Sequence, residues 1–239
     1  MPRSPRFVFF VYTFENHLMK LKKRDYINFD FNLRKVLIMN KKTLILSAAF
    51  GLMGSVAMAE TIELPAPQIN EDATLYQALT DRHSVRHFST RPIDNQTLSN
   101  ILWVAYGVNR EDGRRTIPTA KNEKDLSVYV TNNLGTFLYD ADANNLVRVL
   151  DKSILDMFQT QPFMANVPLV LIYVGSTADN NYAIMHAGSA YQNVELYTAT
   201  NNLGCVVRAL FDKEAVAKAL NLPDGEPVIV SQAIGYEEE

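Results

Sequence analysis

The sequence predicts an α+β fold, and two of its segments carry most of that prediction. Residues 167–175 (VPLVLIYVG) are almost continuously apolar and rich in branched side chains, which is typical of a central strand buried on both faces. Residues 182–203 form the longest helical pattern, and Gly204 ends it. Shorter helix and strand patterns intermingle elsewhere without strict strand–helix–strand alternation, which favours α+β over a doubly wound sheet.

The first 59 residues are expected to lie outside this fold. Lys41 and Lys42, the uncharged apolar stretch 43–56 and the triplet 57–59 (AMA) follow the order of a secretory signal peptide. We therefore expect residues 39–59 to direct export, to the periplasm or otherwise out of the cytoplasm. Because a signal peptide begins at the true N-terminus, residues 1–38 are either an over-called start, with translation beginning at Met39, or a basic N-terminal extension.

The remainder, residues 60–239, has the size of one globular domain. It holds 13 Lys and Arg against 23 Asp and Glu, a net charge of −10, which makes nucleic acid and anionic membrane surfaces poor partners. No apolar run in it approaches the ~20 residues of a membrane span, so we expect no span in the mature protein. Cys205 is the only cysteine, which excludes a disulfide within the chain.

The first third of this domain predicts an extended arm followed by two helices. Residues 61–73 contain two prolines and show no periodicity, as expected of an arm. Residues 74–82 have helical spacing, with one face made of Leu75, Ala78 and Leu79. The next helix has Asp94 as its N-cap and ends at Gly107. Its apolar face consists of Leu98, Ile101, Leu102 and Ala105.

The rest of the domain predicts short elements around the two long ones. The strand candidates are residues 126–131, 134–139, 146–150 and 227–234. Asn132 and Asn133 form a turn signal between the first two. Residues 153–158 and 212–220 have helical patterns, the second with Asp212 as its cap, and the chain from Val206 is a short extended piece.

The long helix 182–203 is crowded with small side chains in its first half. These are Ala183, Ala187, Gly188, Ser189 and Ala190. Small side chains let another backbone approach closely, so we expect this helix to pack against a long partner.

Two arginines and a serine alternate directly after the first helix. In an extended chain Arg82, Ser84 and Arg86 point to the same side. Two guanidinium groups that flank a hydroxyl suit a phosphate or another anion. The alternative is a solvated basic edge that pairs with Asp81 and Asp94.

Two further clusters are polar. The first comprises Pro118, Thr119, Ala120 and Asn122, in a loop where a flat ligand could lie, although an ordinary surface loop has the same composition. The second is Arg208 and Ala209, where the exit from the long helix offers backbone N–H groups and one arginine, although taken alone this segment is simply a helix C-cap. The sequence has no HExxH, CxxC or Ser-His-Asp arrangement, so no metal site and no catalytic side chain is assigned. His186, on the long helix, is expected to be a packing or surface residue.

Taken in order, these clusters resemble the nitroreductase family, particularly its exported, SagB-like branch. The run 82–88 (RHSVRHF) is similar to the family's Arg-x-Ser-x-Arg/Lys-x-Phe motif, and residues 102–107 (LWVAYG) to the helix end that follows it. Residues 118–120 (PTA) stand where the family has Pro-Ser-Ala or Pro-Ser-Ser, with Asn122 at its usual Asn. Residues 188–193 (GSAYQN) resemble its Gly/Ala-rich helix with Gln-Asn. The resemblance covers residues 74–236.

The resemblance implies the architecture and the ligand. The fold would be an antiparallel-rich sheet flanked by helices. The protein would be a homodimer with the long helix at its core and two FMN sites at the subunit interface. Many relatives continue beyond the last strand with basic residues that bind phosphate, whereas this chain stops at residues 235–239 (GYEEE). The phosphate site would therefore depend more on Arg82, with Arg208 from elsewhere in the dimer as a second candidate.

The resemblance also implies a role for each cluster. Arg82 and Ser84 would hold the FMN phosphate and ribityl chain, and Arg86 would lie by N1 and O2 of the pyrimidine edge. The isoalloxazine ring would be lined by Pro118, Thr119, Ala120 and Asn122. Backbone N–H groups around Arg208 and Ala209 would face N5, and the Arg208 side chain is a weaker candidate for binding an anion.

The implied activity is that of an FMN-dependent oxidoreductase with ping-pong turnover. A small-molecule donor would reduce FMN, and a nitroaromatic, quinone or similar flat electrophile would then be reduced. The flavin carries this chemistry and the protein positions it. Three alternatives stay open: an oxidase or dehydrogenase acting on azoline rings or other C–N bonds, a flavin-binding protein without turnover, and an exported binding module without flavin.

Overall fold

A computed structural model describes residues 60–68, 72–176 and 181–238 of the 239-residue chain. These residues fall within one compact unit, Ala57–Glu239. The expected signal peptide, 39–59, and the segment 1–38 lie outside the described residues. None of the described helices is long and apolar enough to cross a membrane.

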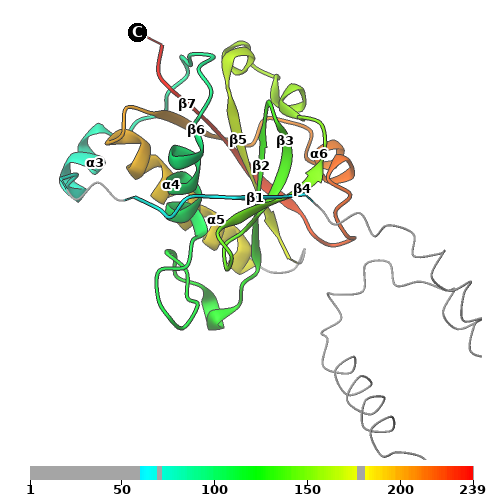
Figure 1. The fold of residues 1–239 in the computed structure, drawn as a ribbon. Helices are drawn as coiled ribbons and strands as arrows, with labels where there is room; N and C mark the ends of the chain where they lie inside the picture. The colour runs from blue at the N-terminus through cyan, green and yellow to red at the C-terminus, as the bar shows by residue number, and fades with distance from the viewer. Residues whose placement is uncertain (1–59, 69–71, 177–180, 239) are drawn as a thin grey trace, which may run out of the picture. The chain divides into compact units, whose positions relative to one another are not determined.

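The centre of the molecule is a seven-stranded sheet in the order β1-β4-β3-β2-β5-β7-β6, in which every neighbouring pair is antiparallel (Figure 1). The expected α+β fold with an antiparallel-rich sheet is therefore confirmed. The strands are β1 Thr61–Glu63, β2 Leu126–Asn132, β3 Gly135–Asp140, β4 Asn145–Leu150, β5 Leu169–Gly175, β6 Gly204–Arg208 and β7 Val228–Gly235. Every residue of β5 is buried, as its unbroken apolar run predicts.

Helices cover both faces of this sheet. The helices are α3 Leu75–Asp81, α4 Asn95–Tyr106, α5 Asn181–Ala199 and α6 Lys213–Ala219, with 3-10 turns η2 Ala120–Asn122, η3 Leu155–Phe158 and η4 Pro162–Asn166. In Figure 1, α4 and α5 lie on one side of the sheet and α6 on the other. Two apolar cores result: one joins α4 and α5 to the sheet, and the other joins α6 and the turns η3 and η4 to its opposite face.

Local capping explains why the helices begin where they do. The side chains of Thr74, Asp94 and Asp212 each accept a hydrogen bond from the backbone N–H three residues on, which satisfies a donor that the helix itself leaves free. Gly107 closes α4 by donating its N–H to the Trp103 carbonyl. The apolar face predicted for α4 is buried against the sheet.

The structure differs from the expectation at three places. The arm 61–73 begins as a strand, since Thr61–Glu63 pairs with β4. Residues 153–158 hold a 3-10 turn instead of an α-helix. The long helix ends at Ala199 instead of Leu203, because Asn202 takes a left-handed conformation with φ of 55° and turns the chain.

The small residues of α5 let the helix pack closely against other elements of the same chain. Ala183, Ala187 and Ala190 are at most 1% exposed, and the helix packs against α4 and against strands β6, β5, β7 and β2 of the sheet. The approach is so close that a Cβ placed on Gly175 would lie 3.2 Å from the Cβ of Ala183. These alanines are therefore buried within the chain's own fold, against α4 and the sheet, and do not face a second copy. The expectation of a long partner for α5 stays a prediction, and it rests on the outer face of the helix, which carries the exposed Ile184 and Met185 and the half-exposed Gly188.

Candidate functional site

The segment after α3 runs extended along the edge of the sheet at β6. Val85 donates its backbone N–H to the Cys205 carbonyl at 2.9 Å, and Val85 and Phe88 are buried. Ser84 and Arg86, on either side of buried Val85, are exposed, as are His83 and His87. Gly204 permits the close approach, because a Cβ there would lie 2.5 Å from a methyl of Val85. This contact joins the segment to β6.

Arg82 is held by a carboxylate on the long helix. Its Nη1 donates to Oε2 of Glu195 at 3.1 Å, with the Arg82 side chain 35% exposed and the Glu195 side chain 9% exposed. The carboxylates considered as alternative partners are engaged elsewhere, since Asp81 accepts from Gln77 and Asp94 caps α4. The capping hydrogen bond from the Thr97 backbone lowers the pKa of Asp94.

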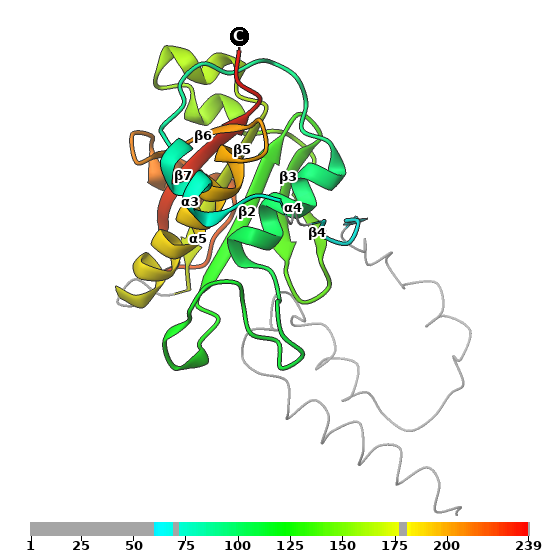
Figure 2. The same cartoon turned by 90° about the vertical axis from the view of Figure 1, so that its left-hand side faces the viewer.

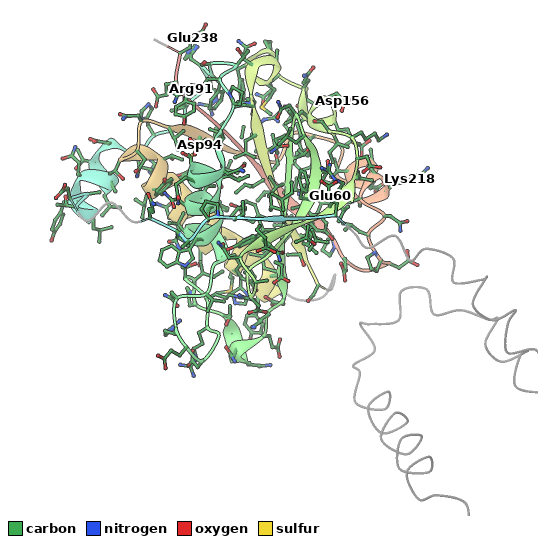
Figure 3. The ribbon with its side chains drawn as sticks, in the orientation of Figure 1. Glu60, Arg91, Asp94, Asp156, Lys218 and Glu238 are labelled. Atoms are coloured by element: carbon green, nitrogen blue, oxygen red, sulfur yellow. The ribbon has the colours of Figure 1, made fainter. Side chains whose placement is uncertain are left out.

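The end of the chain lies beside the same segment. Ser89 donates its backbone N–H to the Tyr236 carbonyl at 2.9 Å, and the Arg91 guanidinium stacks 3.9 Å from the centre of the Tyr236 ring. Figure 3 shows Arg91 and Asp94 next to this C-terminal segment. A cavity of about 470 Å³ opens here, and its wall includes His83, Arg91, Glu195, Cys205 and Glu237.

The second cluster forms a tight turn near the start of α5. Pro118 and Asn122 are exposed, while Thr119 and Ala120 are half-buried. The Ala120 backbone N–H donates to Nε2 of His186 at 2.9 Å, and Nδ1 of His186 lies 2.5 Å from Oδ1 of Asp125. His186 is buried and hydrogen-bonded on both nitrogens, so it is a packing residue with a specific polar task. No spacing in the sequence predicts this, because its partners lie 61 and 66 residues away.

Arg208 has little capacity left for a ligand. Its guanidinium is buried and donates to Gln161 Oε1, the Phe158 carbonyl, Thr160 Oγ1 and the Leu210 carbonyl, at 2.6–3.1 Å. Burial lowers the pKa of Arg208. These bonds brace the end of β6 against residues 158–161. The side chain's suggested role in binding an anion therefore gains no support, whereas Ala209, directly after it, is exposed.

The structure brings two of the three clusters together. The segment 82–86 lies along β6, which leads into Arg208 and Ala209. The Pro118–Asn122 turn is anchored at His186, whereas Arg82 is anchored at Glu195. Nine residues separate His186 from Glu195 on α5, which is about 14 Å along the helix axis. Within one chain, therefore, the turn lies apart from the other two clusters.

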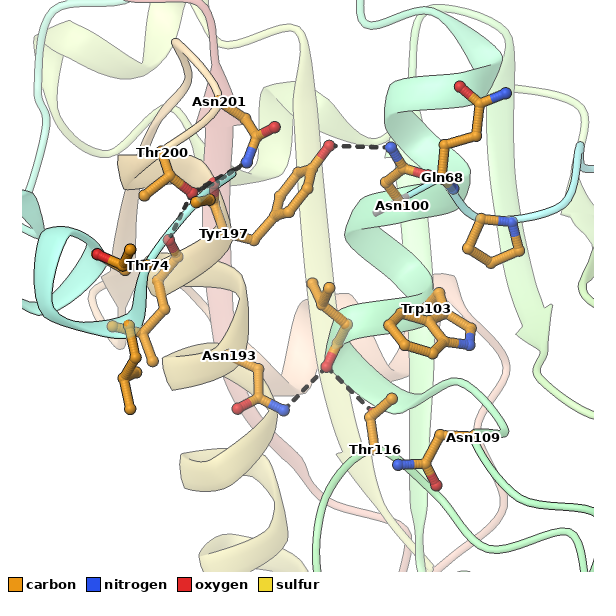
Figure 4. Close-up of a pocket in the computed structure, with 16 residues that line it drawn as sticks. Gln68, Thr74, Asn100, Trp103, Asn109, Thr116, Asn193, Tyr197, Thr200 and Asn201 are labelled. Carbon is orange, nitrogen blue, oxygen red and sulfur yellow. Dashed lines mark hydrogen bonds between the residues drawn. The ribbon is translucent and has the colours of Figure 1, made fainter. Parts of the chain in front are cut away.

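A cavity that the sequence did not predict lies between α3, α4 and α5 (Figure 4). It has a volume of about 390 Å³ and an uncharged lining of aromatic, aliphatic, amide and hydroxyl side chains. Asn100 donates to the Tyr197 hydroxyl at 3.2 Å, and Asn193 donates to the Val104 carbonyl at 3.0 Å. None of the residues expected at the flavin site lines this cavity.

Cys205 is unsuited to nucleophilic chemistry. Burial raises the pKa of its thiol to about 12. Its sulfur lies 3.1 Å from the Thr198 hydroxyl, which makes it part of the polar core. A thiol of such a pKa holds almost no thiolate at neutral pH, and the thiolate is the reactive form.

Comparison with known proteins identifies the fold and the family. The profile of the nitroreductase family matches residues 79–236. A protein of Methanocaldococcus jannaschii that is designated a nitroreductase, MJ1384, is 32% identical over 66% of this chain and 89% of its own length.

Solved structures agree with this result. A structure from Ralstonia eutropha JMP134, described as a nitroreductase, is 31% identical, with a TM-score of 0.70 over 77% of this chain and 93% of its own. A structure from Anabaena variabilis, also described as a nitroreductase, is 17% identical and shares the fold, with a TM-score of 0.65 over 76% of this chain and 42% of its own. The chain belongs to the nitroreductase family, and its activity class is accordingly that of an oxidoreductase.

Proposed function

We propose that this chain is an FMN-dependent oxidoreductase that works as a homodimer. A reduced small-molecule donor would pass hydride or electrons through FMN to a nitroaromatic, a quinone or a similar flat electrophile, in ping-pong order. The observation that carries this proposal is the extended segment with Arg82, Ser84 and Arg86 along β6, next to the exposed Ala209. Family membership supports the redox chemistry.

The residues in this segment fit a flavin phosphate. A phosphate ester needs several charge-assisted hydrogen bonds from donors held in fixed positions. Arg82 offers guanidinium donors beyond the one bound to Glu195, and Ser84 and Arg86 are exposed beside it. Buried Val85 and Phe88 hold the segment in place, so the donors need little ordering on binding.

Each cluster would have a distinct task. When bound, FMN supplies the hydride transfer at N5. Arg82 and Ser84 hold the phosphate and ribityl chain, and Arg86 sets a positive charge beside the pyrimidine edge. The backbone at Arg208 and Ala209 orients the N5 side. No side chain of this protein has to act as an acid or a base for the chemistry to proceed.

A dimer would complete the site. Within one chain, the turn 118–122 lies apart from Arg82: it is bonded to His186 near the start of α5, whereas Arg82 is bonded to Glu195 near its end. The residues of this turn assigned to the flavin ring are Pro118, Thr119, Ala120 and Asn122. A two-fold contact that pairs α5 with α5 in opposite directions would bring the turn of one copy to the Arg82 segment of the other. The exposed Ile184 and Met185 on α5, 58% and 65% accessible, support such a contact.

We also propose that the protein is exported, on the evidence of the signal pattern in residues 39–59. Export bears on the donor, because NAD(P)H is scarce outside the cytoplasm. The finer placement in a SagB-like branch rests on the motif resemblance alone.

The deciding experiment is the absorbance spectrum of the purified protein. A flavin spectrum, with FMN released on denaturation, supports the proposal, and a protein that neither carries nor takes up FMN refutes it. Stopped-flow mixing with NADPH and with other reduced donors then separates an enzyme from a flavin carrier. Product analysis with nitroaromatic and quinone substrates, against azoline-containing peptides, separates reduction from ring oxidation.

A further inference from the structure

A buried hydrogen-bond chain links helix α5 to the turn at 118–122. Nε2 of His186 accepts the Ala120 backbone N–H at 2.9 Å, and Nδ1 faces Oδ1 of Asp125 at 2.5 Å. The side chains of His186 and Asp125 are 6% and 4% exposed. Neither residue belongs to a motif that the sequence singled out.

The partners determine which nitrogen carries the proton. The Ala120 N–H can only donate, so Nε2 must be the unprotonated acceptor. Nδ1 therefore carries the proton and donates a hydrogen bond to Oδ1 of Asp125, which fixes the ring in that tautomer. Asp125 is itself tied to the sheet, because its carbonyl accepts the Ser176 backbone N–H at 2.9 Å. The chain of bonds thus runs from the sheet through His186 to the middle of the turn.

The turn is one that the chain would not adopt without support. Lys121 and Asn122 have φ of 53° and 58°, in the left-handed region. Asn tolerates this region, but it is disfavoured for a lysine. Strained conformations of this kind persist only where the surroundings impose them, and they cluster at ligand sites. Two local bonds close the turn, from Asn122 N–H to the Thr119 carbonyl and from Glu123 N–H to the Ala120 carbonyl. His186 supplies the bond that joins it to the rest of the fold.

We propose that His186, oriented by Asp125, is a positioning residue that holds the Pro118–Asn122 turn in the shape that receives the flavin ring. This inference rests on the proposed function, because the turn is the part of the site assigned to the ring. The Ala120 N–H points inward to His186, which leaves Pro118 and Asn122 on the outer side of the turn, where both are exposed. Losing the bond would free Lys121 to leave its disfavoured conformation and would disorder that surface.

Two substitutions of His186 separate its two bonds. In His186→Gln the side-chain amide reaches the place of Nε2, so the bond to Ala120 is kept. In His186→Asn the amide reaches only the place of Nδ1, so the contact with Asp125 is kept and the turn is released. Thr136→Val is the control. Thr136 is a buried residue of β3, away from the turn, and the substitution removes the hydrogen bond that its hydroxyl donates to the Lys152 carbonyl.

The measurements are hydrogen exchange of the Ala120 amide and titration of FMN into the full-length protein. In His186→Asn we expect exchange at Ala120 to rise at least tenfold while β5 stays protected, and the FMN dissociation constant to rise about tenfold. His186→Gln should restore both values to near those of the parent. Thr136→Val should lower stability and leave both values unchanged.

Several outcomes would overturn the inference. Unchanged exchange at Ala120 in His186→Asn would mean that His186 does not hold the turn. Increased exchange with unchanged FMN affinity would mean that the held shape does not matter to the flavin. Equal losses of FMN affinity in His186→Asn and Thr136→Val would mean that the affinity falls only because the fold is less stable. If the parent itself binds no FMN, the proposed function fails, and exchange alone then decides whether His186 holds the turn.

Discussion

The Arg82–Glu195 pair connects the candidate phosphate site to the interior of the molecule. Glu195 is nearly buried on α5, and its carboxylate Oε2 accepts from Arg82 at 3.1 Å. A carboxylate at such a position is costly without a partner, so Arg82 serves the fold as well as the ligand. Substituting Arg82 alone would therefore change both FMN binding and the stability of the fold, and a double variant is needed to separate the two effects.

We expect Arg82→Ala to weaken FMN binding roughly 10- to 150-fold, the loss of about 1.5–3 kcal/mol for a hydrogen bond to a charged group. The same variant should lower the free energy of unfolding by about 1–3 kcal/mol, because Glu195 is left unpaired. Adding Glu195→Gln should recover most of the stability and none of the affinity. Urea denaturation without FMN and fluorescence titration with FMN measure the two quantities. Affinity that returns with stability would remove Arg82 from the phosphate site.

Arg86 is expected to act on the redox potential more than on affinity. Reduction places negative charge on the pyrimidine edge of the flavin, so a neighbouring guanidinium binds the reduced form more strongly than the oxidised form. Arg86→Ala should make the midpoint potential of bound FMN about 30 mV more negative, which corresponds to a tenfold difference between the two oxidation states. Spectroelectrochemical titration measures this shift.

The control for Arg86 removes the same charge elsewhere. Lys218, labelled in Figure 3, is an exposed residue of α6, and α6 packs on β7 instead of on the Arg82 segment. Lys218→Ala should leave the potential of bound FMN unchanged. Identical potentials in Arg86→Ala and the parent would refute the assignment of Arg86 to the pyrimidine edge.

Among the secondary structure elements, those whose bounds depend on neighbouring residues were predicted from the sequence, whereas those that depend on distant residues were missed. The bounds of α4 were predicted from its own residues, because the Asp94 cap and the Gly107 stop act within one turn of the helix. Strand β1 was missed, since its pairing with β4 joins residues more than 80 positions apart. The carboxylate partner of Arg82 and the role of His186 were missed for the same reason.

Helix α5 shows the limit of composition as evidence. Its alanines indicated a close neighbour, and within this chain the neighbours are α4 and the sheet. Composition indicates that a backbone comes near but not which backbone. Gly188 differs from these alanines, because it is half-exposed and a Cβ there would meet only Tyr191, at 3.7 Å or more. A side chain at this position therefore has room within the chain, and only a partner could exclude it.

We expect Gly188→Leu to weaken the dimer by about 1–3 kcal/mol through overpacking. The stability of the monomer should be kept or raised, because leucine favours a helix more than glycine does. Sedimentation over a range of concentrations measures the dimer, and Lys218→Leu is the matched control on an exposed position of α6. A flavin-replete monomer of the parent protein would contradict the shared-site proposal, and unchanged dimerisation of Gly188→Leu would contradict this face of α5.

In the whole molecule, the sheet begins at Thr61, just after the signal pattern of residues 39–59. The Glu60 carbonyl accepts the Arg148 backbone N–H at 2.9 Å, and the Glu60 carboxylate accepts from Arg148 Nε at 2.7 Å. Glu60 is also the residue that follows the expected cleavage triplet at 57–59. A cut before Glu60 would therefore leave both contacts and β1 intact.

We expect the mature protein, isolated from a periplasmic or envelope fraction, to begin with Glu-Thr-Ile-Glu-Leu. N-terminal sequencing tests this directly, and Ala59→Arg is the matched variant, because a large charged residue before the cut should block processing. A chain that starts at Glu60 should melt at the same temperature as the processed protein. A chain that starts at Pro65 should melt lower, since it lacks β1 and the carboxylate that pairs with Arg148. A cytoplasmic protein that retains residues 43–59 would overturn both the proposed export and the expected start of the mature chain.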